Sequence, residues 1–371
     1  MLNEVPETVA ERSGIDPMKL DLAFSLLTDA VEQKLTPSVA ALVGRRGQIV
    51  GQYAAGHYAM ADSQRYETSM QTLYDCASLT KVVVTLPLVL KLIENQSITL
   101  SDCVADFLPE FRNGKKASVT IHHLLTHTSG LPPSVEKTFL GWESEEIKNF
   151  LFSQALADEP GKQVIYSDLG FIALGEIVSK VLGQPLDEAA DHYLFRPLGM
   201  TDSKFCPSKT LRERTAATEF RSDIGYRLWG EVHDERAFAL GGVCGHAGLF
   251  STAVDLGVYA AMWLEEGSRD EHRILSPELI RSSVRNHTKS LNGNRGYGWV
   301  LKGDGYDVSG NRFSSRSFGH TGYTGTSLWM DPDTGLYVIL LTNRVYFGRR
   351  QPLAKLRKAF HDAVAASMFR L

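Results

Sequence analysis

Cysteine is scarce in this chain of 371 residues, which contains only four. Cys76, Cys103, Cys206 and Cys244 are widely scattered, and none of them forms the C-x-x-C spacing of a zinc or redox motif. This scarcity excludes a small fold held together by disulfides and predicts reduced, structural thiols. Because Cys76 has no base at motif spacing, we expect a packed thiol there rather than a nucleophile.

The chain also lacks an excess of positive charge and a long hydrophobic run. Its 39 basic and 43 acidic residues give a net charge of −4, so neither nucleic acid nor an anionic membrane is expected as a partner. The most apolar stretch, residues 82–90, contains Pro87 and is too short to span a bilayer. Residues 1–7 show neither the basic region nor the apolar run of a signal peptide, which predicts a cytoplasmic location.

Two catalytic signatures are missing as well. No G-x-S-x-G occurs, so an α/β-hydrolase would have no nucleophile elbow. His123 and His127 have the i, i+4 spacing of some zinc ligands, but Leu124 follows His123 where a zinc protease has glutamate. We therefore expect structural histidines, with no metal and no cofactor.

The chain does contain Ser78-Leu79-Thr80-Lys81, at the start of a predicted apolar helix over residues 78–95. Positions i and i+3 of a helix share a face, so Lys81 can reach Ser78 Oγ. A serine needs an adjacent group to take its proton before it becomes a good nucleophile, and burial lowers the pKa of a lysine toward that of a working base. The pattern is common by chance, and a helix start with a serine cap is the simpler explanation.

Short apolar segments and turn residues predict strands near both ends of the chain. Near the start, a helix over residues 16–34 precedes a hairpin of residues 39–43 and 48–53. Near the end, four strand-like segments precede a closing helix, at residues 296–300, 318–321, 326–330, 336–342 and 353–368. Between them the pattern is mostly helical, most clearly near residues 119–127, 144–157, 169–182 and 186–194.

This order predicts an α+β fold. One antiparallel sheet is built from both termini and flanked by helices, with an all-helical domain inserted. We expect residues 1–77 and 250–371 to form the α/β domain and residues 78–249 the mostly helical domain, with the active site between the two.

Two further motifs extend the first. They are Tyr166-Ser167-Asp168, ahead of a helical stretch, and Gly319-His320-Thr321-Gly322-Tyr323-Thr324-Gly325, ahead of a strand. With Ser78-x-x-Lys81 they match the order and rough spacing of the three motifs of penicillin-binding-type serine hydrolases. Residues 119–132 and 248–256 also resemble two further segments of these hydrolases. The chain therefore resembles the serine β-lactamase-related family, particularly its class C branch, with relatives among D-amino-acid peptidases, family VIII esterases and cytosolic muropeptide amidases.

The resemblance implies a β-lactamase/transpeptidase-like fold and a role for each matching residue. Ser78 would be the nucleophile that forms an acyl-enzyme, Lys81 would accept or relay its proton, and Tyr166 would share that work. Backbone N–H groups of Ser78 and Tyr323 would form the oxyanion hole. The expected substrate-binding residues are Asp168, His320, Thr321 and Gly322.

Two positions depart from the family pattern. Asp168 stands where the middle motif usually has asparagine, and a carboxylate near Lys81 favours the ammonium form. This leaves two alternatives, with Tyr166 as the base or with Lys81 as an electrostatic partner. His320 stands where the last motif usually has lysine, and a neutral imidazole attracts a substrate carboxylate less well. We therefore expect poor β-lactamase activity, an ester or a less acidic amide as substrate, and activity that falls below the His320 pKa.

Two loops have a structural and a functional explanation. The glycine-rich residues 241–248 could be a tightly packed loop, or could border the cleft with His246 as a substrate contact. We expect no metal site at His233-Asp234-Glu235 nearby. Asn343-Arg344, at the end of the last strand, could face the cleft or form a solvated turn.

The leading functional hypothesis is a serine hydrolase acting on a small-molecule ester, amide or peptidoglycan fragment. A β-lactamase or D-Ala-D-Ala carboxypeptidase is the alternative among enzymes. A non-catalytic binding or sensor protein is the alternative from another class, because a fold alone does not determine function.

Overall fold

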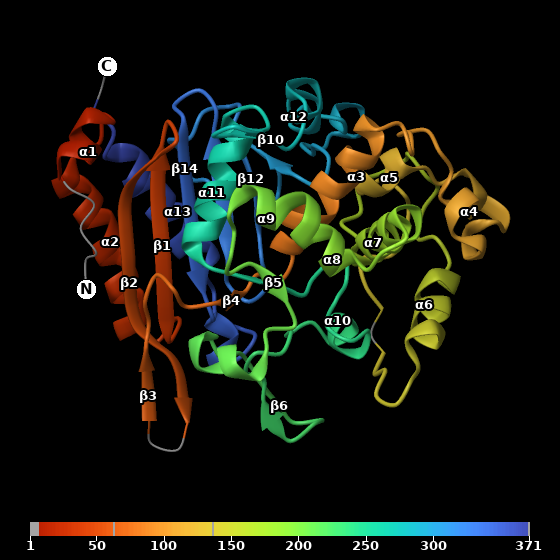
Figure 1. The fold of residues 1–371 in the computed structure, drawn as a ribbon, viewed down its shortest axis with the longest axis horizontal. Helices are drawn as coiled ribbons and strands as arrows, with labels where there is room; N and C mark the ends of the chain where they lie inside the picture. The colour runs from red at the N-terminus through yellow and green to blue at the C-terminus, as the bar shows by residue number, and fades with distance from the viewer. Residues whose placement is uncertain (1–6, 62–63, 136, 370–371) are drawn as a thin grey trace.

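The computed structural model describes residues 7–61, 64–135 and 137–369. Seven strands form one antiparallel sheet in the order β11-β12-β13-β14-β1-β2-β3 (Figure 1). Their bounds are β1 Ser38–Arg45, β2 Gln48–Ala61, β3 Gln64–Glu67, β11 Val300–Leu301, β12 Phe318–Thr321, β13 Ser327–Asp331 and β14 Leu336–Thr342. β1 pairs with β14, with Val39 opposite Thr342. Strands from both ends of the chain thus share one sheet, which confirms the predicted architecture.

Helices cover both faces of this sheet. Alternate side chains of β1 point to opposite faces, as the period of two requires. Val39, Ala41 and Val43 pack with α2 and α13 on one face, whereas Ala40 and Leu42 face the core that includes α11. Both faces are therefore buried, which explains why residues 39–43 of this strand are all apolar.

The remaining elements are short strands and helices, most of them on the side of the molecule that carries α3 to α10 (Figure 1). The α-helices are α1 Glu7–Arg12, α2 Pro17–Glu32, α3 Leu86–Glu94, α4 Val104–Phe107, α5 Ile121–Leu125, α6 Ser144–Ser153, α7 Asp168–Leu182, α8 Leu186–Ala190, α9 Arg196–Leu198, α10 Glu235–Ala239, α11 Ala253–Leu264, α12 Pro277–Ser283 and α13 Ala354–Ala366. The short strands are β4 Tyr74–Asp75, β5 Lys204–Phe205, β6 Phe220–Arg221, β7 Tyr226–Arg227, β8 Leu249–Ser251, β9 Ser268–Arg269 and β10 His272–Arg273. Short 3₁₀ helices span Pro109–Phe111, Gly114–Ser118, Lys209–Arg214, Lys289–Leu291 and Arg344–Phe347, and π-helical turns span Lys81–Thr85 and Asp191–Phe195.

Several predicted elements are shorter than expected, such as the helix predicted over residues 144–157, which ends at Ser153; two of them have a clear cause. The strand predicted over residues 296–300 begins only at Val300, because the N–H groups of Tyr297 and Gly298 donate to carbonyls of other segments instead of a neighbouring strand. The helix predicted over residues 119–127 ends at Leu125, and His127 beyond it has a left-handed φ of +57°. In both places long-range contacts override the local pattern.

The predicted helix over residues 78–95 contains an irregular turn. It is helical from Leu79, passes through the π-helical turn Lys81–Thr85 and continues as α3. Pro87 has no N–H to donate within this helix, and the Tyr259 hydroxyl donates to the Val82 carbonyl instead. The wider turn is the irregularity that accompanies the proline.

The division into residues 1–77 plus 250–371 and residues 78–249 stays a prediction. Among the described residues no single helix is both long and apolar enough to cross a membrane. One bent pair, α7 with Leu186–Leu198, meets the length and composition required when its two halves are taken together.

Candidate active site

Ser78 lies on a sharp turn between β4 and the helical segment that begins at Leu79. Ala77 before it has a left-handed φ of +46°, and its N–H donates to Asp75 Oδ1 at 2.8 Å. Every other residue from 72 to 90 is buried, whereas Ser78 is partly exposed. The turn therefore leaves Ser78 partly exposed within an otherwise buried segment.

Lys81 lies beneath this hydroxyl with its side chain fully buried. Its Nζ donates to Ser78 Oγ at 3.0 Å and to Asp168 Oδ1 at 2.8 Å. Burial opposes the charge of the ammonium, but the charges of Asp168 and Tyr166 and their hydrogen bonds outweigh burial and raise the Lys81 pKa. The expected contact between Lys81 and Ser78 is present, and Asp168 favours the ammonium as predicted.

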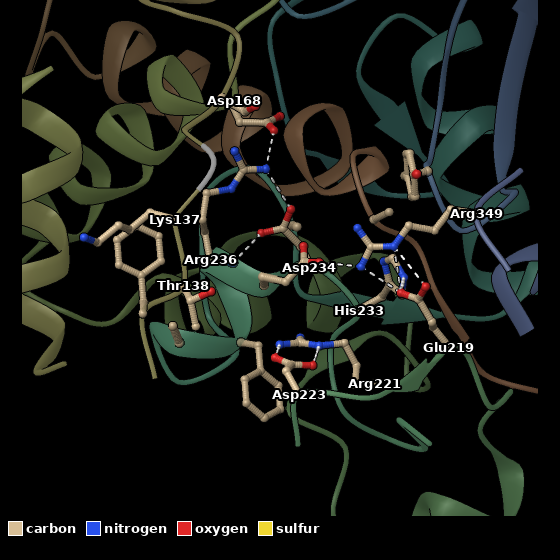
Figure 2. A pocket seen from close by; sticks show the side chains of 18 of the residues that line it. Lys137, Thr138, Asp168, Glu219, Arg221, Asp223, His233, Asp234, Arg236 and Arg349 are labelled. Carbon is tan, nitrogen blue, oxygen red and sulfur yellow. Dashed lines mark hydrogen bonds and ion pairs between the residues drawn. The ribbon is translucent and has the colours of Figure 1, made fainter. Parts of the chain in front are cut away.

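A chain of ion pairs continues behind Lys81. Figure 2 shows Arg236 between Asp168 and Asp234, to which its Nη2 donates at 2.7 and 3.0 Å. Asp234 in turn accepts the Nε2–H of His246 at 2.8 Å. Asp234 also caps α10 by accepting the backbone N–H of Arg236, which ties the network to this helix. Sequence reasoning did not identify Arg236, which has no recognisable motif around it.

Opposite charges in this network stabilise one another. Burial would raise the pKa of both carboxyl groups, but nearby positive charges lower it. For Asp168 these are the charges of Lys81, His246 and Arg236, and for Asp234 those of His246 and Arg236. Asp168, Asp234 and His246 offer ligand atoms within 4.8 Å of one another, a spacing that could hold a metal ion. The same oxygens accept hydrogen bonds from Lys81, Arg236 and His246. A metal would have to displace these cations.

Of the two alternatives for the loop that carries His246, the structure favours tight packing over a substrate contact. The His246 side chain is 1% exposed and lines neither of the two cavities at Ser78. Its Nε2–H is bound to Asp234, and its Nδ1 lies 3.2 Å from Cys244 Sγ. Gly175 and Gly245 approach so closely that a Cβ on Gly175 would lie 2.8 Å from Gly245 Cα, so tight packing explains the glycines of this loop.

The charge of His246 should make stability depend on pH. Burial opposes the imidazolium, but Asp234 and Cys244 raise the His246 pKa from 6.5 to about 9. A folded-state pKa above the unfolded one adds stability that is complete below pH 6.5 and is lost as pH rises through about 9. This charge should contribute about 3 kcal/mol to the difference in free energy of unfolding between pH 6 and pH 9, and His246→Gln should remove that contribution. Urea unfolding at the two pH values measures the difference.

The exposed histidine His192 provides the control. His192→Gln should keep the wild-type loss of stability between pH 6 and pH 9, whereas His246→Gln should show a flatter dependence. Equal slopes for the two variants would contradict a buried imidazolium at position 246.

The turn at residues 322–326 lies against the Ser78 turn. Thr324 Oγ1 donates to the Asp75 carbonyl at 2.7 Å, and Thr326 Oγ1 donates to the Cys76 carbonyl at 3.1 Å. A Cβ at Gly322 would lie 2.4 Å from the Cys76 carbonyl oxygen, so only glycine permits this approach. The N–H groups of Ser78 and Tyr323 have no acceptor among the described residues, as an oxyanion hole requires.

Ser78, Tyr166 and Tyr323 line two cavities on either side of the hydroxyl. The larger has a volume of about 960 Å³ and lies between residues 134–135 with 137–140 on one side and residues 219–223 on the other. Its charged side chains are mostly paired with one another, as for Arg221 with Asp223 and Arg349 with Glu219 (Figure 2). The Nη1 atoms of Arg221 and Arg236 are buried without a hydrogen-bond partner.

The smaller cavity has a volume of about 220 Å³ and contains three arginines. Arg295 is paired with Asp304, its Nη2 at 3.0 Å from the carboxylate. Arg344 and Arg357 donate only to backbone carbonyls and have no carboxylate partner among the described residues. Burial, and then the charge of Arg344, lower the Arg357 pKa to about 9. This cavity is therefore suited to an anion.

His320 lines the same small cavity, with Thr321 and Gly322. Its Nδ1 lies 2.9 Å from the Thr321 carbonyl, so Nδ1 carries the hydrogen and Nε2 is a free acceptor, buried without a partner. Burial, and then the charges of Lys81 and Arg295, lower the His320 pKa to about 3. His320 is neutral as predicted, but its titration lies far below the pH range in which activity would be measured.

Asn343 and Arg344 have different environments. Asn343 is buried and bound to Ser38, Tyr58 and Ala217, so its amide is structural. Arg344 lines the small cavity, with its guanidinium 4.8 Å from the centre of the Tyr323 ring. Sequence reasoning left Arg344 open and missed Arg295 and Arg357, which belong to no motif.

Comparison with known proteins agrees with the fold. The family model described as "Beta-lactamase" matches residues 25–362. A relative from Escherichia coli (strain K12), named "Putative D-alanyl-D-alanine carboxypeptidase", is 29% identical over 91% of this chain and 85% of its own length.

Solved structures share the fold. EstCE1, described as a hydrolase with promiscuous acyltransferase activity, has a TM-score of 0.73 at 22% identity, over 93% of this chain and 99% of its own. A penicillin-binding protein homologue from Caulobacter crescentus has a TM-score of 0.75 at 19% identity, over 95% of this chain and 99% of its own. At these identities the similarity concerns the fold alone.

Proposed function

The chain belongs to the Beta-lactamase family of hydrolases, and from this premise we propose that it forms an acyl-enzyme on Ser78. The observation that carries the proposal is the placement of Ser78 Oγ, partly exposed between two cavities and 3.0 Å from a fully buried lysine amine. A solvent-accessible hydroxyl above a buried cation is the arrangement that an activated serine needs. A merely structural serine cap does not require the buried lysine.

Lys81 cannot accept a proton while its amine is protonated, so Tyr166 is the better base. Lys81 Nζ lies 4.9 Å from the centre of the Tyr166 ring, and the Arg295 guanidinium lies 5.7 Å from it. Both positive charges stabilise the negative charge on Tyr166 that proton transfer requires.

The proposed reaction has two halves. Tyr166 takes the proton of Ser78 Oγ as that oxygen attacks the substrate carbonyl carbon, and the N–H groups of Ser78 and Tyr323 stabilise the oxyanion. Tyr166 then gives the proton to the leaving amine or alcohol as its bond to the carbonyl carbon breaks. In the second half a water molecule attacks the acyl-enzyme, Tyr166 takes its proton, and Ser78 leaves with that proton.

The small cavity favours a substrate that carries a carboxylate. The sequence argument against such substrates rested on the missing lysine of the last motif, and His320 is indeed neutral. Arg344 and Arg357 supply positive charge in the same cavity from residues outside that motif. We therefore propose an amide or ester with a carboxylate near the scissile bond, as in D-alanyl-D-alanine peptides, which agrees with the name of the Escherichia coli relative.

This substrate class can be tested with an N-acylated D-alanyl-D-alanine peptide and its C-terminal amide. We expect kcat/KM to be about 30-fold higher for the free carboxylate, since a hydrogen bond to a charged group contributes about 2 kcal/mol. Arg344→Met should remove most of this preference by raising KM for the carboxylate peptide.

The exposed residue Arg350, near Arg344, is the matched control, and Arg350→Met should keep the preference. Equal hydrolysis of the two peptides by the wild-type enzyme would contradict a carboxylate subsite. Faster hydrolysis of simple esters than of both peptides would favour an esterase, the second candidate, which the neutral His320 supports.

A further inference from the structure

Segment 119–132 matches the family but contributes no residue to the proposed mechanism. Its His127 is 1% exposed and follows α5, which ends at Leu125. The φ of His127 is +57°, a left-handed conformation that costs a side chain with a Cβ about 1 kcal/mol and that glycine or asparagine usually occupies. We therefore expect the contacts of His127 to offset the cost of this conformation.

Those contacts hold the two neighbours of Tyr166. The carbonyl of His127 accepts the N–H of Ile165 at 2.8 Å, and its Nδ1 accepts the N–H of Ser167 at 3.1 Å. Between these two hydrogen bonds the imidazole packs against the Tyr166 ring, with centroids 4.6 Å apart. One residue thus binds the backbone on both sides of Tyr166 and contacts its side chain.

The neighbouring residues of the segment extend this contact. The Ser167 hydroxyl donates to the Pro132 carbonyl at 2.7 Å, and the Asp168 N–H donates to the Pro133 carbonyl at 3.0 Å. Because Nδ1 is an acceptor, Nε2 carries the hydrogen, and it is buried without a partner. The neutral tautomer is therefore the one that fits this site.

We propose that His127 is a positioning residue that holds Tyr166 in the geometry required for proton transfer with Ser78. The inference rests on the proposed role of Tyr166. A shift of the phenol by a fraction of an ångström changes the rate of proton transfer more than it changes substrate binding, so kcat should depend on His127 while KM should not.

Two substitutions separate the contributions of His127. His127→Phe keeps a ring but loses the acceptor for Ser167 N–H and still carries the left-handed penalty. His127→Asn keeps an acceptor at the position of Nδ1 and tolerates the left-handed conformation. On p-nitrophenyl butyrate we expect His127→Phe to lower kcat about 30-fold with KM nearly unchanged, and His127→Asn to lower it only about threefold.

A double-mutant cycle with Tyr166→Phe tests whether His127 acts through Tyr166. In the Tyr166→Phe background, His127→Phe should cause no further loss, because the group that it positions is already gone. His122→Phe, in the same segment, should leave kcat unchanged in both backgrounds; the His122 ring packs on His287 and Tyr297. Additive losses for His127 and Tyr166, or a rise in KM that matches the fall in kcat, would overturn the proposal.

Failure of the inference can be told apart from failure of the proposed function. Full activity of Tyr166→Phe would contradict the role of Tyr166 itself. Loss of activity in Tyr166→Phe with full activity in His127→Phe would contradict only the positioning role of His127. If His127→Phe does not fold, as judged by thermal unfolding, the smaller loss in His127→Asn must vanish in the Tyr166→Phe background for the proposal to stand.

Discussion

Replacing Ser78 with alanine should lower kcat/KM on p-nitrophenyl esters and on D-alanyl-D-alanine peptides by about 10⁴-fold or more. The substitution removes the Oγ atom on which we propose that the acyl-enzyme forms, while the N–H donors at residues 78 and 323 remain in place. Labelling of the wild-type enzyme with a fluorophosphonate probe, followed by mass spectrometry of the modified peptide, should find the adduct on Ser78.

Ser134 is a suitable control because it lines the larger cavity with Ser78. Ser134→Ala should keep both turnover and labelling. If the wild-type protein neither reacts with the probe nor exceeds Ser78→Ala in turnover, the non-catalytic binding or sensor protein becomes the better hypothesis. Efficient hydrolysis of nitrocefin would instead favour the β-lactamase alternative.

Lys81→Met should have the second largest effect, with a fall in kcat of about 10³-fold. Methionine has a similar volume but leaves Ser78 Oγ without its donor and Tyr166 without the nearest positive charge. Asp168 would then keep Arg236 as its main partner. Breaking half of this buried ion pair should lower the free energy of unfolding by about 3 kcal/mol, measured by urea denaturation.

Lys116→Met separates the catalytic effect from the loss of stability. Lys116 is also a buried lysine, but its Nζ donates to the Phe152 carbonyl rather than to groups at Ser78. We expect Lys116→Met to destabilise the protein without lowering kcat. A Lys81→Met enzyme that keeps more than about a tenth of wild-type kcat would show that the buried ammonium is dispensable for the reaction.

The cluster around Ser78 also explains why a lysine can remain charged in a closed core. An isolated buried ammonium would lose its proton, because desolvation disfavours the charge. Asp168 prevents this, and Arg236 keeps Asp168 ionised by binding its second oxygen. Asparagine, which the family usually has at this position, could not supply that charge, and this difference is the reason why we propose Tyr166 rather than Lys81 as the base.

Local features of the molecule could be predicted from the sequence because they depend on neighbouring residues. Ser78 and Lys81 lie one helical turn apart, and helix geometry alone brings Nζ within reach of Oγ. Asp16 and Pro17 begin α2 as a cap and a first helical residue. Short apolar runs bounded by turn residues predict β1 and β14, and the turn-forming residues 331–335 connect β13 to β14.

Only the tertiary structure decided which distant residues share the site. Asp168 and Arg236 are 68 residues apart, and Arg295 and Arg357 come from segments without any motif. The same limit applies to His246, for which the sequence left a packed loop and a cleft contact open, and to His127, whose neighbour Tyr166 is 39 residues away along the chain. Sequence spacing specifies geometry only within one helix or hairpin. Ion pairs, pKa shifts and cavities arise where separate segments pack together and exclude water.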